Sequence, residues 1–265
     1  MNPSTGLLIT QPLNTFRYNL TAPGPNPSRQ DTSHPHHAII DPREKFALVP
    51  DLGADLTRIY SISSQGLSEL TPVSTAPGSG PRHGVFSPGG KYYYQVNELS
   101  NKIDVFCVTY RPNIVLTLVQ NISTYPTGTT PALDPVPTAG EIQISSDGKY
   151  VYASNRNDKT FPNARVAPSP STQTTESDSI AAYSVGAHGK LTFLELSPVA
   201  GITPRHFSLD PRNGGEYIAV ATQTTGRVAV YERDKITGRL GTIPVASIDM
   251  KTLGVEQPLC VIWLD

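Results

Sequence analysis

Charged residues are scarce in this chain. Asp, Glu, Lys and Arg make up 16% of its 265 residues, where soluble domains average roughly 25%. The 21 basic and 22 acidic residues leave a formal charge of −1, so the chain lacks the basic surplus that is typical of nucleic-acid-binding proteins. It also lacks any run of about 18 apolar residues, the length that a membrane-spanning helix requires. We therefore expect no nucleic acid and no membrane among its partners.

Cysteine is nearly absent as well. The chain has only Cys107 and Cys260, and two cysteines so far apart do not define a disulfide, so we expect two buried, reduced thiols. The first residues, Met1–Gln11, lack the basic and then apolar pattern of a secretory signal. This absence favours the cytoplasm as the default location, with secretion left open if the natural N-terminus lies upstream of Met1.

Turn-forming residues, by contrast, are abundant. There are 25 prolines and 21 glycines, together with 12 tyrosines, and Val, Ile, Leu and Tyr recur in short segments between them. This combination predicts an all-β protein with many short strands. One self-similar segment, a polar start followed by a short apolar run and a tight turn, occurs four times. The copies align at His36, Arg82, Gly140 and Arg205.

Each copy is followed by the same series of elements. A second strand comes after the turn, then a polar loop and a third strand, often with a fourth run behind it. The third strands are predicted at Leu56–Ile62, Lys102–Thr109, Ser179–Val185 and Arg227–Arg233, and fourth runs at Ile114–Ile122 and Leu191–Leu196. Four antiparallel strands per unit, repeated at intervals of about 46 to 65 residues, are the pattern of propeller blades.

We therefore predict a single β-propeller domain over residues 1–265, with four complete blades of four antiparallel strands and additional strands at both termini. The blades are expected at 34–79, 80–137, 138–202 and 203–255, the outer strands of an earlier blade within 1–33, and a closing strand at 256–265. The Ser-, Thr- and Pro-rich stretch Thr160–Asp178 interrupts the third blade. We expect a long mobile loop there, either a tolerated insertion or a flap over a site.

Candidate site residues come from comparing the four units with one another. Because antiparallel strands reverse at each turn, the start of a first strand and the end of a second strand lie at one rim, around the mouth of the central channel. The turn and strand positions carry similar residues in the four units, whereas the ionisable side chains at this rim differ from unit to unit. The first strands hold His36, Arg82, Gly140 and Arg205, followed by His37, His83, Glu141 and His206; the second strands end in Leu52, Glu98, Arg156 and Gln223, preceded by Asp51, Asn97, Asn155 and Thr222.

These residue types indicate anion binding and proton transfer. Arginines bind carboxylates and phosphates through paired hydrogen bonds, and a carboxylate beside a histidine suits acid–base chemistry near neutral pH. The structural alternatives are that the Arg-His pairs only bond neighbouring blades and that Glu98 is a solvated turn residue. No Gly-x-Ser-x-Gly elbow or catalytic cysteine context is present, which disfavours covalent catalysis. His34, His36 and His37 lack a matching carboxylate or cysteine, so we expect no metal.

The repeated motifs can be compared with those of known families. They are His36-His37 before Ile-Ile-Asp-Pro, Val49–Gly53 with Asp55, Gly80–His83 with Phe86–Pro88 and Gly90–Tyr92, Asn97-Glu98, Asp147–Arg156 and Thr203–Arg205. As an ensemble, over roughly residues 23–265, they resemble the seven-bladed propeller lactonases. That family includes propeller-type 6-phosphogluconolactonases and fungal 3-carboxy-cis,cis-muconate lactonizing enzymes.

The resemblance implies metal-free and cofactor-free chemistry that opens or closes a lactone ring on a small polyanion. In the muconate cyclases a His, a Glu and two Arg around the channel mouth are the proposed active-site groups, and by motif they fall on His36, Glu98, Arg82 and Arg156. The two arginines would then bind carboxylate or phosphate, while Glu98 and His36 would move the proton. The other rim residues are expected to bind the substrate: His83, Asn97, Glu141, Asn155, Arg205, His206 and Gln223.

Two features separate this chain from the family pattern. Seven blades need well over 300 residues at about 45–50 residues each, so we expect the chain to begin inside the family fold, or its terminal pieces to pair into a fifth, composite blade. The residues also do not separate a muconate cyclase from a sugar lactonase. The competing function is a non-catalytic propeller that serves as a binding scaffold. Catalysis is favoured if Glu98, Arg82 and Arg156 lie within the span of one substrate.

Overall fold

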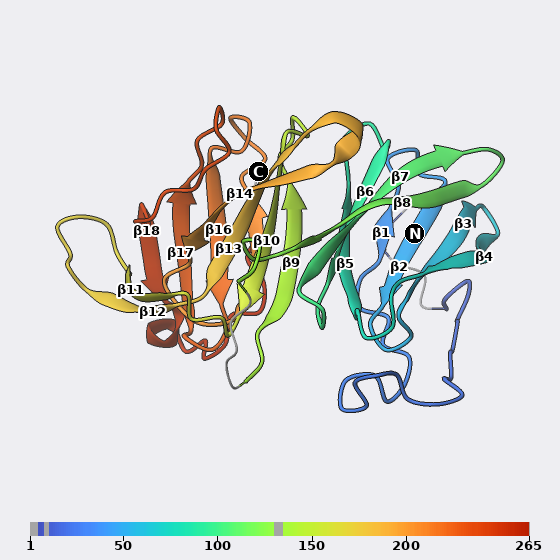
Figure 1. Ribbon diagram of the computed structural model, residues 1–265, viewed down its shortest axis with the longest axis horizontal. Coiled ribbons are helices and arrows are strands. Elements are labelled where there is room, and N and C mark those ends of the chain that lie inside the picture. The colour runs from blue at the N-terminus through green and yellow to red at the C-terminus, as the bar shows by residue number, and fades with distance from the viewer. Residues whose placement is uncertain (1–4, 8–10, 130–134, 265) are drawn as a thin grey trace.

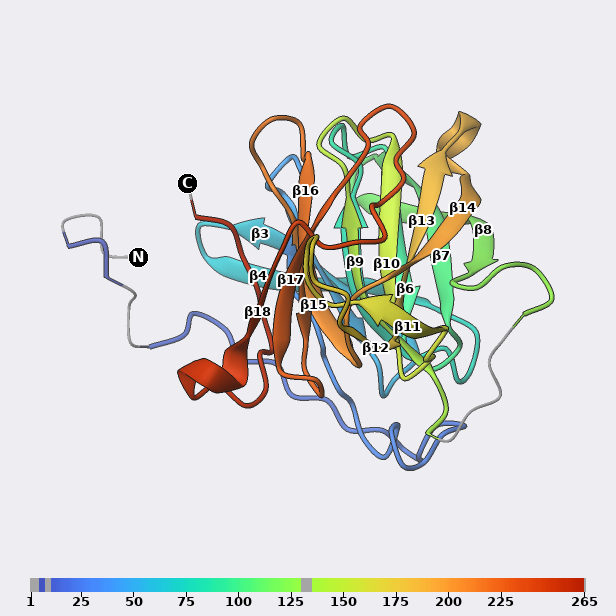
Figure 2. The ribbon, with the colours of Figure 1, turned by 90° about the vertical axis from the view of Figure 1, so that its left-hand side faces the viewer.

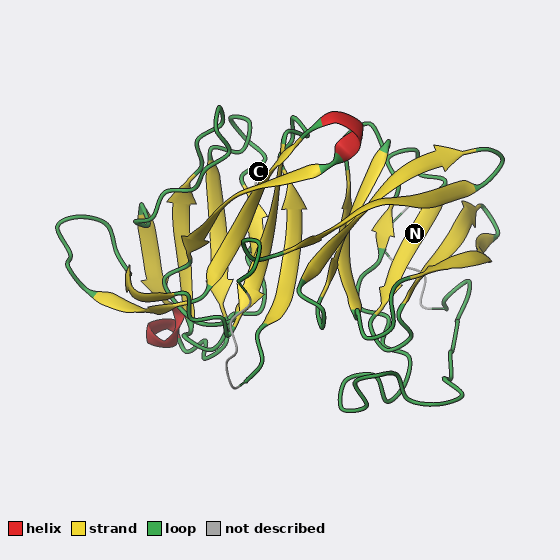
Figure 3. Cartoon of the chain, viewed as in Figure 1, coloured by secondary structure: helices red, strands yellow, loops and turns green. Residues whose placement is uncertain are grey.

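The molecule is built around four antiparallel sheets of four strands each. The computed structural model describes residues 5–7, 11–129 and 135–264. Among these, the sheets are accompanied by one two-stranded sheet and two short 3₁₀ helices, η1 (Ala187–Gly189) and η2 (Met250–Leu253) (Figure 3). The prediction of an all-β chain with four complete blades is confirmed.

The strands follow one another along the chain with a single interruption, in the third sheet. The first sheet consists of β1 (Ile39–Ile40), β2 (Phe46–Asp51), β3 (Leu56–Ser63) and β4 (Gly66–Ser74). The second consists of β5 (Pro81–Phe86), β6 (Tyr92–Asn97), β7 (Lys102–Tyr110) and β8 (Ile114–Ser123). The third consists of β9 (Thr138–Ile144), β10 (Tyr150–Arg156), β13 (Ser179–Val185) and β14 (Leu191–Pro198). The fourth consists of β15 (Pro204–Leu209), β16 (Tyr217–Thr222), β17 (Arg227–Glu232) and β18 (Ala246–Asp249).

The four sheets lie side by side in chain order, with the first and the last at opposite ends of the row (Figure 1). Consecutive sheets contact each other through their early strands: β2 contacts β5, and β9 contacts both β5 and β15. Seen at right angles, along the row, the sheets overlap one another (Figure 2). The beginnings of the first strands are therefore gathered along one side, as blades require.

The tight turns between first and second strands repeat in detail. In the second sheet, the Ser87 backbone carbonyl accepts a hydrogen bond from the Gly90 amide, and the Ser87 hydroxyl accepts one from the Tyr92 amide. In the third sheet, Ser145 makes the same two bonds with Gly148 and Tyr150. Gly90 and Gly148 have φ values of 66° and 71°, a conformation that glycine adopts without strain. These local bonds fix the register of each first hairpin.

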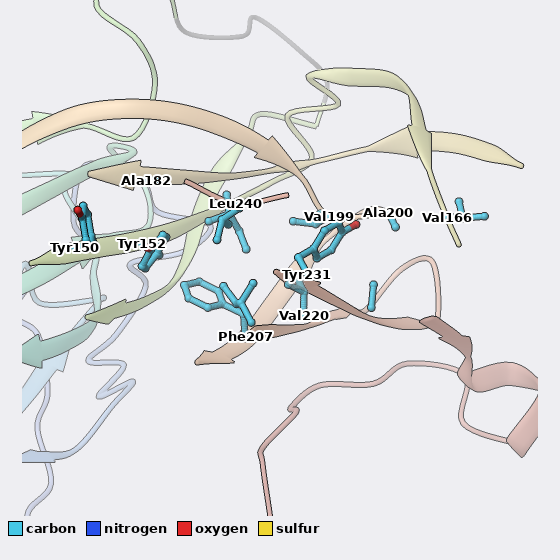
Figure 4. Packing of buried hydrophobic residues seen from close by; sticks show 13 residues of the cluster. Tyr150, Tyr152, Val166, Ala182, Val199, Ala200, Phe207, Val220, Tyr231 and Leu240 are labelled. Atoms are coloured by element: carbon cyan, nitrogen blue, oxygen red, sulfur yellow. The ribbon is translucent and has the colours of Figure 1, made fainter. Parts of the chain in front are cut away.

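The core lies between adjacent sheets. One cluster joins the third sheet to the fourth, and its largest fully buried members are Tyr152 of β10, Phe207 of β15 and Tyr231 of β17 (Figure 4). All three side chains are at most 1% exposed, and burying such a side chain stabilises the fold by roughly 1.5–3 kcal/mol. The Tyr152 hydroxyl donates to the Gly238 carbonyl at 2.7 Å, so its polar end is satisfied inside the cluster.

The prediction of terminal strands is wrong for the described residues. Within 5–7 and 11–38 the structure has only an isolated bridge, from Pro35 to Asp51, and within 254–264 it has no strand. A strand requires a partner backbone, and these segments instead attach through side chains. The Tyr18 ring lies under the Arg58 guanidinium of the first sheet, and the Trp263 indole donates to the Ser208 carbonyl at 3.0 Å. No fifth, composite blade forms in the described part of the chain.

The prediction of a long mobile loop is also wrong in part. The Thr160–Asp178 stretch contains a hairpin of two strands, β11 (Phe161–Arg165) and β12 (Thr174–Ser177). Ala164 is buried at 6% exposure, so the hairpin packs against the body of the protein. Cys107 and Cys260 are free as expected, but Cys107 is only half-buried and Cys260 is exposed. No helix among the described residues has the length and apolar character needed to cross a membrane.

Candidate functional site at the rim of the blades

A repeated irregularity at the start of the first strands positions the site. In the second sheet Pro81 pairs with Asn97 and His83 with Val96, so Arg82 forms a bulge. Arg205 bulges in the same way between Pro204 and His206 of the fourth sheet. A β-bulge redirects its side chain out of the ladder. The bulge therefore aims both arginines away from the sheets at the same rim.

The register of the other two sheets agrees with this alignment. Ala139 of β9 pairs with Asn155, and the ladder shifts before Ile142, which puts Gly140 at the level of the bulged arginines. The bridge between Pro35 and Asp51 matches the pair of Pro81 with Asn97 in the second sheet. This match places His36 at the level of Arg82, as the comparison of the repeats predicted.

Glu98 is the centre of a buried cluster of arginines. Its Oε2 atom accepts a hydrogen bond from Arg82 Nε at 2.9 Å and lies 2.8 Å from Arg156 Nη2. Its Oε1 atom accepts a bond from Arg29. The side chains of Glu98 and Arg82 are at most 2% exposed. Glu98 is thus not a solvated turn residue, and one carboxylate holds three cations.

The cluster fixes the protonation state of Glu98. Burial alone would raise the pKa of this carboxyl, but the guanidiniums of Arg156, Arg82 and Arg29 outweigh it and lower the pKa to about 2. Burial lowers the pKa of Arg82 to about 10, and the neighbouring Arg156 adds to that effect. At neutral pH the group therefore consists of one carboxylate anion and three guanidinium cations.

Backbone carbonyls hold the two buried arginines in place. Arg82 Nη1 donates to the carbonyl of Gly140 at 2.8 Å, and Arg156 Nη2 donates to that of Ala139 at 2.9 Å. The Nε atom of Arg156 is buried and has no hydrogen-bond partner among the described residues. A buried donor without a partner is costly, and an acceptor that reached this atom would remove that cost.

A second cluster, the histidine cluster, lies beside the first and consists of Glu141, His83, His206, His36 and His37. His83 Nδ1 lies 2.9 Å from Glu141 Oε2, and His206 Nε2 lies 3.7 Å from the same oxygen. The His37 ring stacks on the His83 ring with centroids 4.5 Å apart, and the His36 ring is tilted against His83 at 5.1 Å. Two of the four rings thus face one buried carboxylate, and the other two pack against His83.

Three imidazoles of the histidine cluster, those of His36, His37 and His83, are neutral at pH 7. Burial, together with Arg82 and His83, lowers the pKa of His36 to about 3. Burial and His83 lower the pKa of His37 to about 4. Burial also lowers the pKa of His83, against the opposing effect of the Glu141 carboxylate. These imidazoles can accept hydrogen bonds and protons at neutral pH.

Arg205 completes the ring of charges. It is partly exposed and makes no hydrogen bond or ion pair with any residue that the structure describes. It lies close enough to Arg82, Arg156 and His36 to lower the pKa of each. A partly exposed arginine that lies beside other cations is suited to bind the carboxylate or phosphate of a ligand.

Three predicted site residues make their hydrogen bonds outside the two clusters. Asn97 is buried, and it bonds Asp104 of its own sheet at 2.8 Å. Asn155 is also buried, with its amide donating to Ser179 and to a backbone carbonyl. Gln223 is partly exposed and bonds Gln257 near the C-terminus. These contacts favour a scaffolding role for the two asparagines, while the other rim residues come together.

Arg29 is the site residue that the sequence comparison missed. It lies in the irregular segment before the first sheet, where no strand pattern or repeat marks it, and its side chain is 44% exposed. The short hydrogen-bonded turn Asn26–Gln30 positions it, with the Gln30 side chain bonded to the carbonyl of Leu52 at 3.0 Å. Gln30 is fully buried, and its burial anchors the segment at the rim in the structure.

The rim carries a net positive charge. Among the described residues, the arginines Arg29, Arg82, Arg156 and Arg205 face the two carboxylates of Glu98 and Glu141, so the guanidiniums exceed the carboxylates by two. This surplus suits a small anionic ligand. A groove of about 680 Å³ lies between the first two sheets, but its lining contains none of these residues. No group of residues in the described ranges is arranged to hold a metal ion.

Comparisons with known proteins agree with this architecture. The family model described as "Lactonase, 7-bladed beta-propeller" matches residues 10–263. A protein of Arthroderma benhamiae named "Probable 6-phosphogluconolactonase" is 37% identical over 95% of this chain, and the 6-phosphogluconolactonase of Bacillus subtilis is 32% identical over 92%. The chain spans 59% and 61% of the lengths of these two relatives.

A solved structure shows the same relationship. The periplasmic gluconolactonase of Pseudomonas aeruginosa superposes with a TM-score of 0.69 at 29% identity, over 83% of this chain and 55% of its own. The resemblance inferred from the rim motifs is therefore confirmed at the level of the family. The chain belongs to the seven-bladed β-propeller lactonases.

Proposed function

We propose that this chain opens the ring of an anionic sugar lactone by hydrolysis, with 6-phosphogluconolactone as the first candidate substrate. The observation that carries the proposal is the rim cluster, in which Arg205 has no partner among the described residues and lies beside a surplus of positive charge. The names of the relatives at 37% and 32% identity support the substrate class.

The arginines serve two purposes in this reaction. A phosphate or carboxylate on the substrate would bind to the unpaired guanidinium of Arg205, because bidentate hydrogen bonds to arginine fit both groups. When water adds to the lactone carbonyl, negative charge develops on the carbonyl oxygen, and fixed donors stabilise that charge. The guanidinium of Arg156, fixed between Glu98 and the carbonyl of Ala139, provides such a donor.

The contacts change the role that we assign to Glu98. A general base needs a free lone pair and a pKa near the working pH, whereas Glu98 accepts bonds from three arginines and its pKa is about 2. We assign it the positioning of Arg82 and Arg156. Glu98 is then essential for turnover without taking up a proton.

Ring opening is favoured over the alternatives. The cations would also hold the carboxylates of a muconate, but the relatives compared here are named for lactone hydrolysis. A purely binding scaffold is disfavoured because Arg82 and Arg156 lie within 3 Å of one Glu98 oxygen. That spacing falls within the span of a single substrate.

The test is a hydrolysis assay of the purified chain with 6-phosphogluconolactone, gluconolactone and 3-carboxymuconate. We expect release of acid from the phosphorylated lactone above the spontaneous rate. Arg205→Gln should raise the KM for that lactone by roughly 10- to 100-fold, since a charge-assisted bond contributes about 1.5–3 kcal/mol. The matched control is Arg239→Gln, whose side chain is 53% exposed. Rates equal to the spontaneous rate for every substrate would refute the proposal.

A further inference from the structure

His83 combines a fixed orientation with a free nitrogen. Its Nδ1 atom lies 2.9 Å from Glu141 Oε2, and a carboxylate only accepts hydrogen bonds, so Nδ1 carries the hydrogen in the neutral ring. The lone pair then belongs to Nε2, which bonds to no residue that the structure describes. The His83 side chain is 16% exposed. Water can therefore reach the rim side of this imidazole.

Glu141 is built to hold that orientation. It is 3% exposed, and its Oε1 atom accepts the backbone amide of Ile142 at 3.0 Å, while Oε2 faces His83. The backbone amide of Glu141 itself donates to Ser154 at 2.9 Å. The stacked ring of His37 then limits rotation of the His83 ring. A buried carboxylate, an imidazole and a free ring nitrogen form the arrangement that orients a general base.

The other candidates for this role are less suitable. Every oxygen of Glu98 already accepts a hydrogen bond from an arginine. The ring of His36 has no carboxylate at hydrogen-bond distance among the described residues, so no acceptor fixes which of its nitrogens carries the hydrogen. The Nδ1 atom of His206 faces the backbone amide of Val261 at 3.4 Å, and its Nε2 atom faces Glu141.

We infer that His83 is the general base of the site and that Glu141 positions it, an inference that rests on the lactone hydrolysis proposed above. His83 Nε2 takes a proton from water while the water oxygen forms a bond to the lactone carbonyl carbon and the carbonyl electron pair moves to its oxygen. The bond between that carbon and the ring oxygen then breaks, and the ring oxygen receives the proton from His83. One lactone and one water thus give one hydroxy acid.

The charges around His83 set its response to pH. Burial lowers its pKa, and the Glu141 carboxylate opposes that effect, so the ring is neutral and able to accept a proton at pH 7. The ionisable groups that face it are Glu141 of β9, His206 of β15, Arg82 of its own strand, and His36 and His37 before β1. Removing the Glu141 charge would lower the pKa of His83 further.

Two variants test the inference. His83→Asn keeps an N–H group near the Nδ1 position but lacks the distal nitrogen, and we expect turnover of 6-phosphogluconolactone to fall by roughly 10²- to 10⁴-fold. Binding of the product, 6-phosphogluconate, should change by no more than about twofold. Glu141→Gln should lower kcat and move the acid limb of kcat/KM to lower pH. His188→Asn, at an exposed histidine of η1, is the control.

The tautomer of His83 provides a readout that does not depend on activity. Nitrogen-15 NMR of the whole chain at neutral pH should show the hydrogen on Nδ1, and Glu141→Gln should lower the pKa of the His83 signal. If the wild type is active and His83→Asn keeps more than about a tenth of its rate, the inference is overturned. A hydrogen found on Nε2 of His83 would overturn it as well. An inactive wild type would refute the proposed hydrolysis, and the tautomer and titration would then decide whether the dyad exists.

Discussion

Replacing Glu98 by Gln should destabilise the protein strongly at neutral pH and only weakly in acid. The substitution removes the one anion that lies among Arg29, Arg82 and Arg156. An amide also places an N–H group where one of the carboxylate oxygens accepts bonds, so donors face each other. Because Glu98 and Arg82 are almost fully buried, solvent cannot screen the uncompensated cations.

The magnitude follows from two effects. Removing one partner of a buried ion pair costs about 3–5 kcal/mol, which we expect at pH 7. The pKa of Glu98 falls from 4.5 to about 2 on folding, which corresponds to about 3 kcal/mol of stability. The folded-state pKa is depressed, so this contribution is complete above pH 4.5 and is lost as the pH falls toward 2. The variant has no such contribution to lose.

Urea unfolding of both proteins at pH 7 and in stepwise more acidic buffers measures the difference directly. The gap between wild type and Glu98→Gln should shrink by about 1.4 kcal/mol for each pH unit below 4.5. Glu176→Gln, at a half-exposed ion pair with Lys159, should change stability by no more than about 1 kcal/mol. If Glu98→Gln proves too unstable to purify, Arg29→Gln replaces it, because Arg29 is the exposed member of the cluster. Its difference in stability from the wild type should be smaller and should also shrink as the pH falls. A gap that stays constant with pH would refute the reasoning.

Two further predictions concern stability away from the arginines. Burial and the adjacent Asp178 raise the pKa of Asp158 above the usual carboxyl value of about 4. The protonated carboxyl therefore stabilises the fold fully below about pH 4, and this contribution is lost as the pH rises. For this reason the urea midpoint of the wild type should fall between acid and neutral pH, and Asp158→Asn should make that fall smaller. An equal fall in the two proteins would contradict the prediction. Gly84→Ala would place a Cβ atom 2.0 Å from the hydroxyl of buried Tyr93 and should cost about 1–3 kcal/mol in urea unfolding. Gly89→Ala, with nothing within 4 Å, should change stability by less than about 0.5 kcal/mol, and equal effects of the two would contradict the steric argument.

The blades were predictable because their signals are local. The third strand predicted at Ser179–Val185 is β13 with the same bounds, and that predicted at Lys102–Thr109 is one residue shorter than β7. Alternating apolar residues and the serine- and glycine-based turns determine both the strands and their register. Since the register is repeated, aligning the units also predicted that Arg82, Glu98 and Arg156 lie at one rim, and the structure brings them into contact there.

The contacts between blades were not predictable in the same way. Arg29 reaches Glu98 from an irregular segment, and no spacing rule connects the two residues. The bond from His83 to Glu141 joins β5 to β9, so it depends on how adjacent sheets pack rather than on either strand alone. The expected terminal strands failed for a related reason: an apolar segment forms a strand only when another backbone lies beside it.

Gly140 explains why the rim positions differ between blades. It is the one glycine in a row that otherwise holds His36, Arg82 and Arg205. A Cβ atom at Gly140 would lie 2.6 Å from the Ser154 hydroxyl and 3.4 Å from the Arg156 side chain. The Gly140 carbonyl also accepts the bond from Arg82. The third blade therefore contributes backbone where the second and fourth contribute cations.

The same glycine links the two clusters of the site. The Ser154 hydroxyl that it accommodates accepts the backbone amide of Glu141, and Glu141 in turn faces His83. A side chain at Gly140 would thus displace the Ser154 hydroxyl and with it disturb the positioning of Glu141 and His83, while it would meet Arg156 at an ordinary contact distance. Because one bulged register supplies both clusters, the blades can hold an anion-binding group and a proton acceptor side by side. Neither group requires a departure from the repeated scaffold.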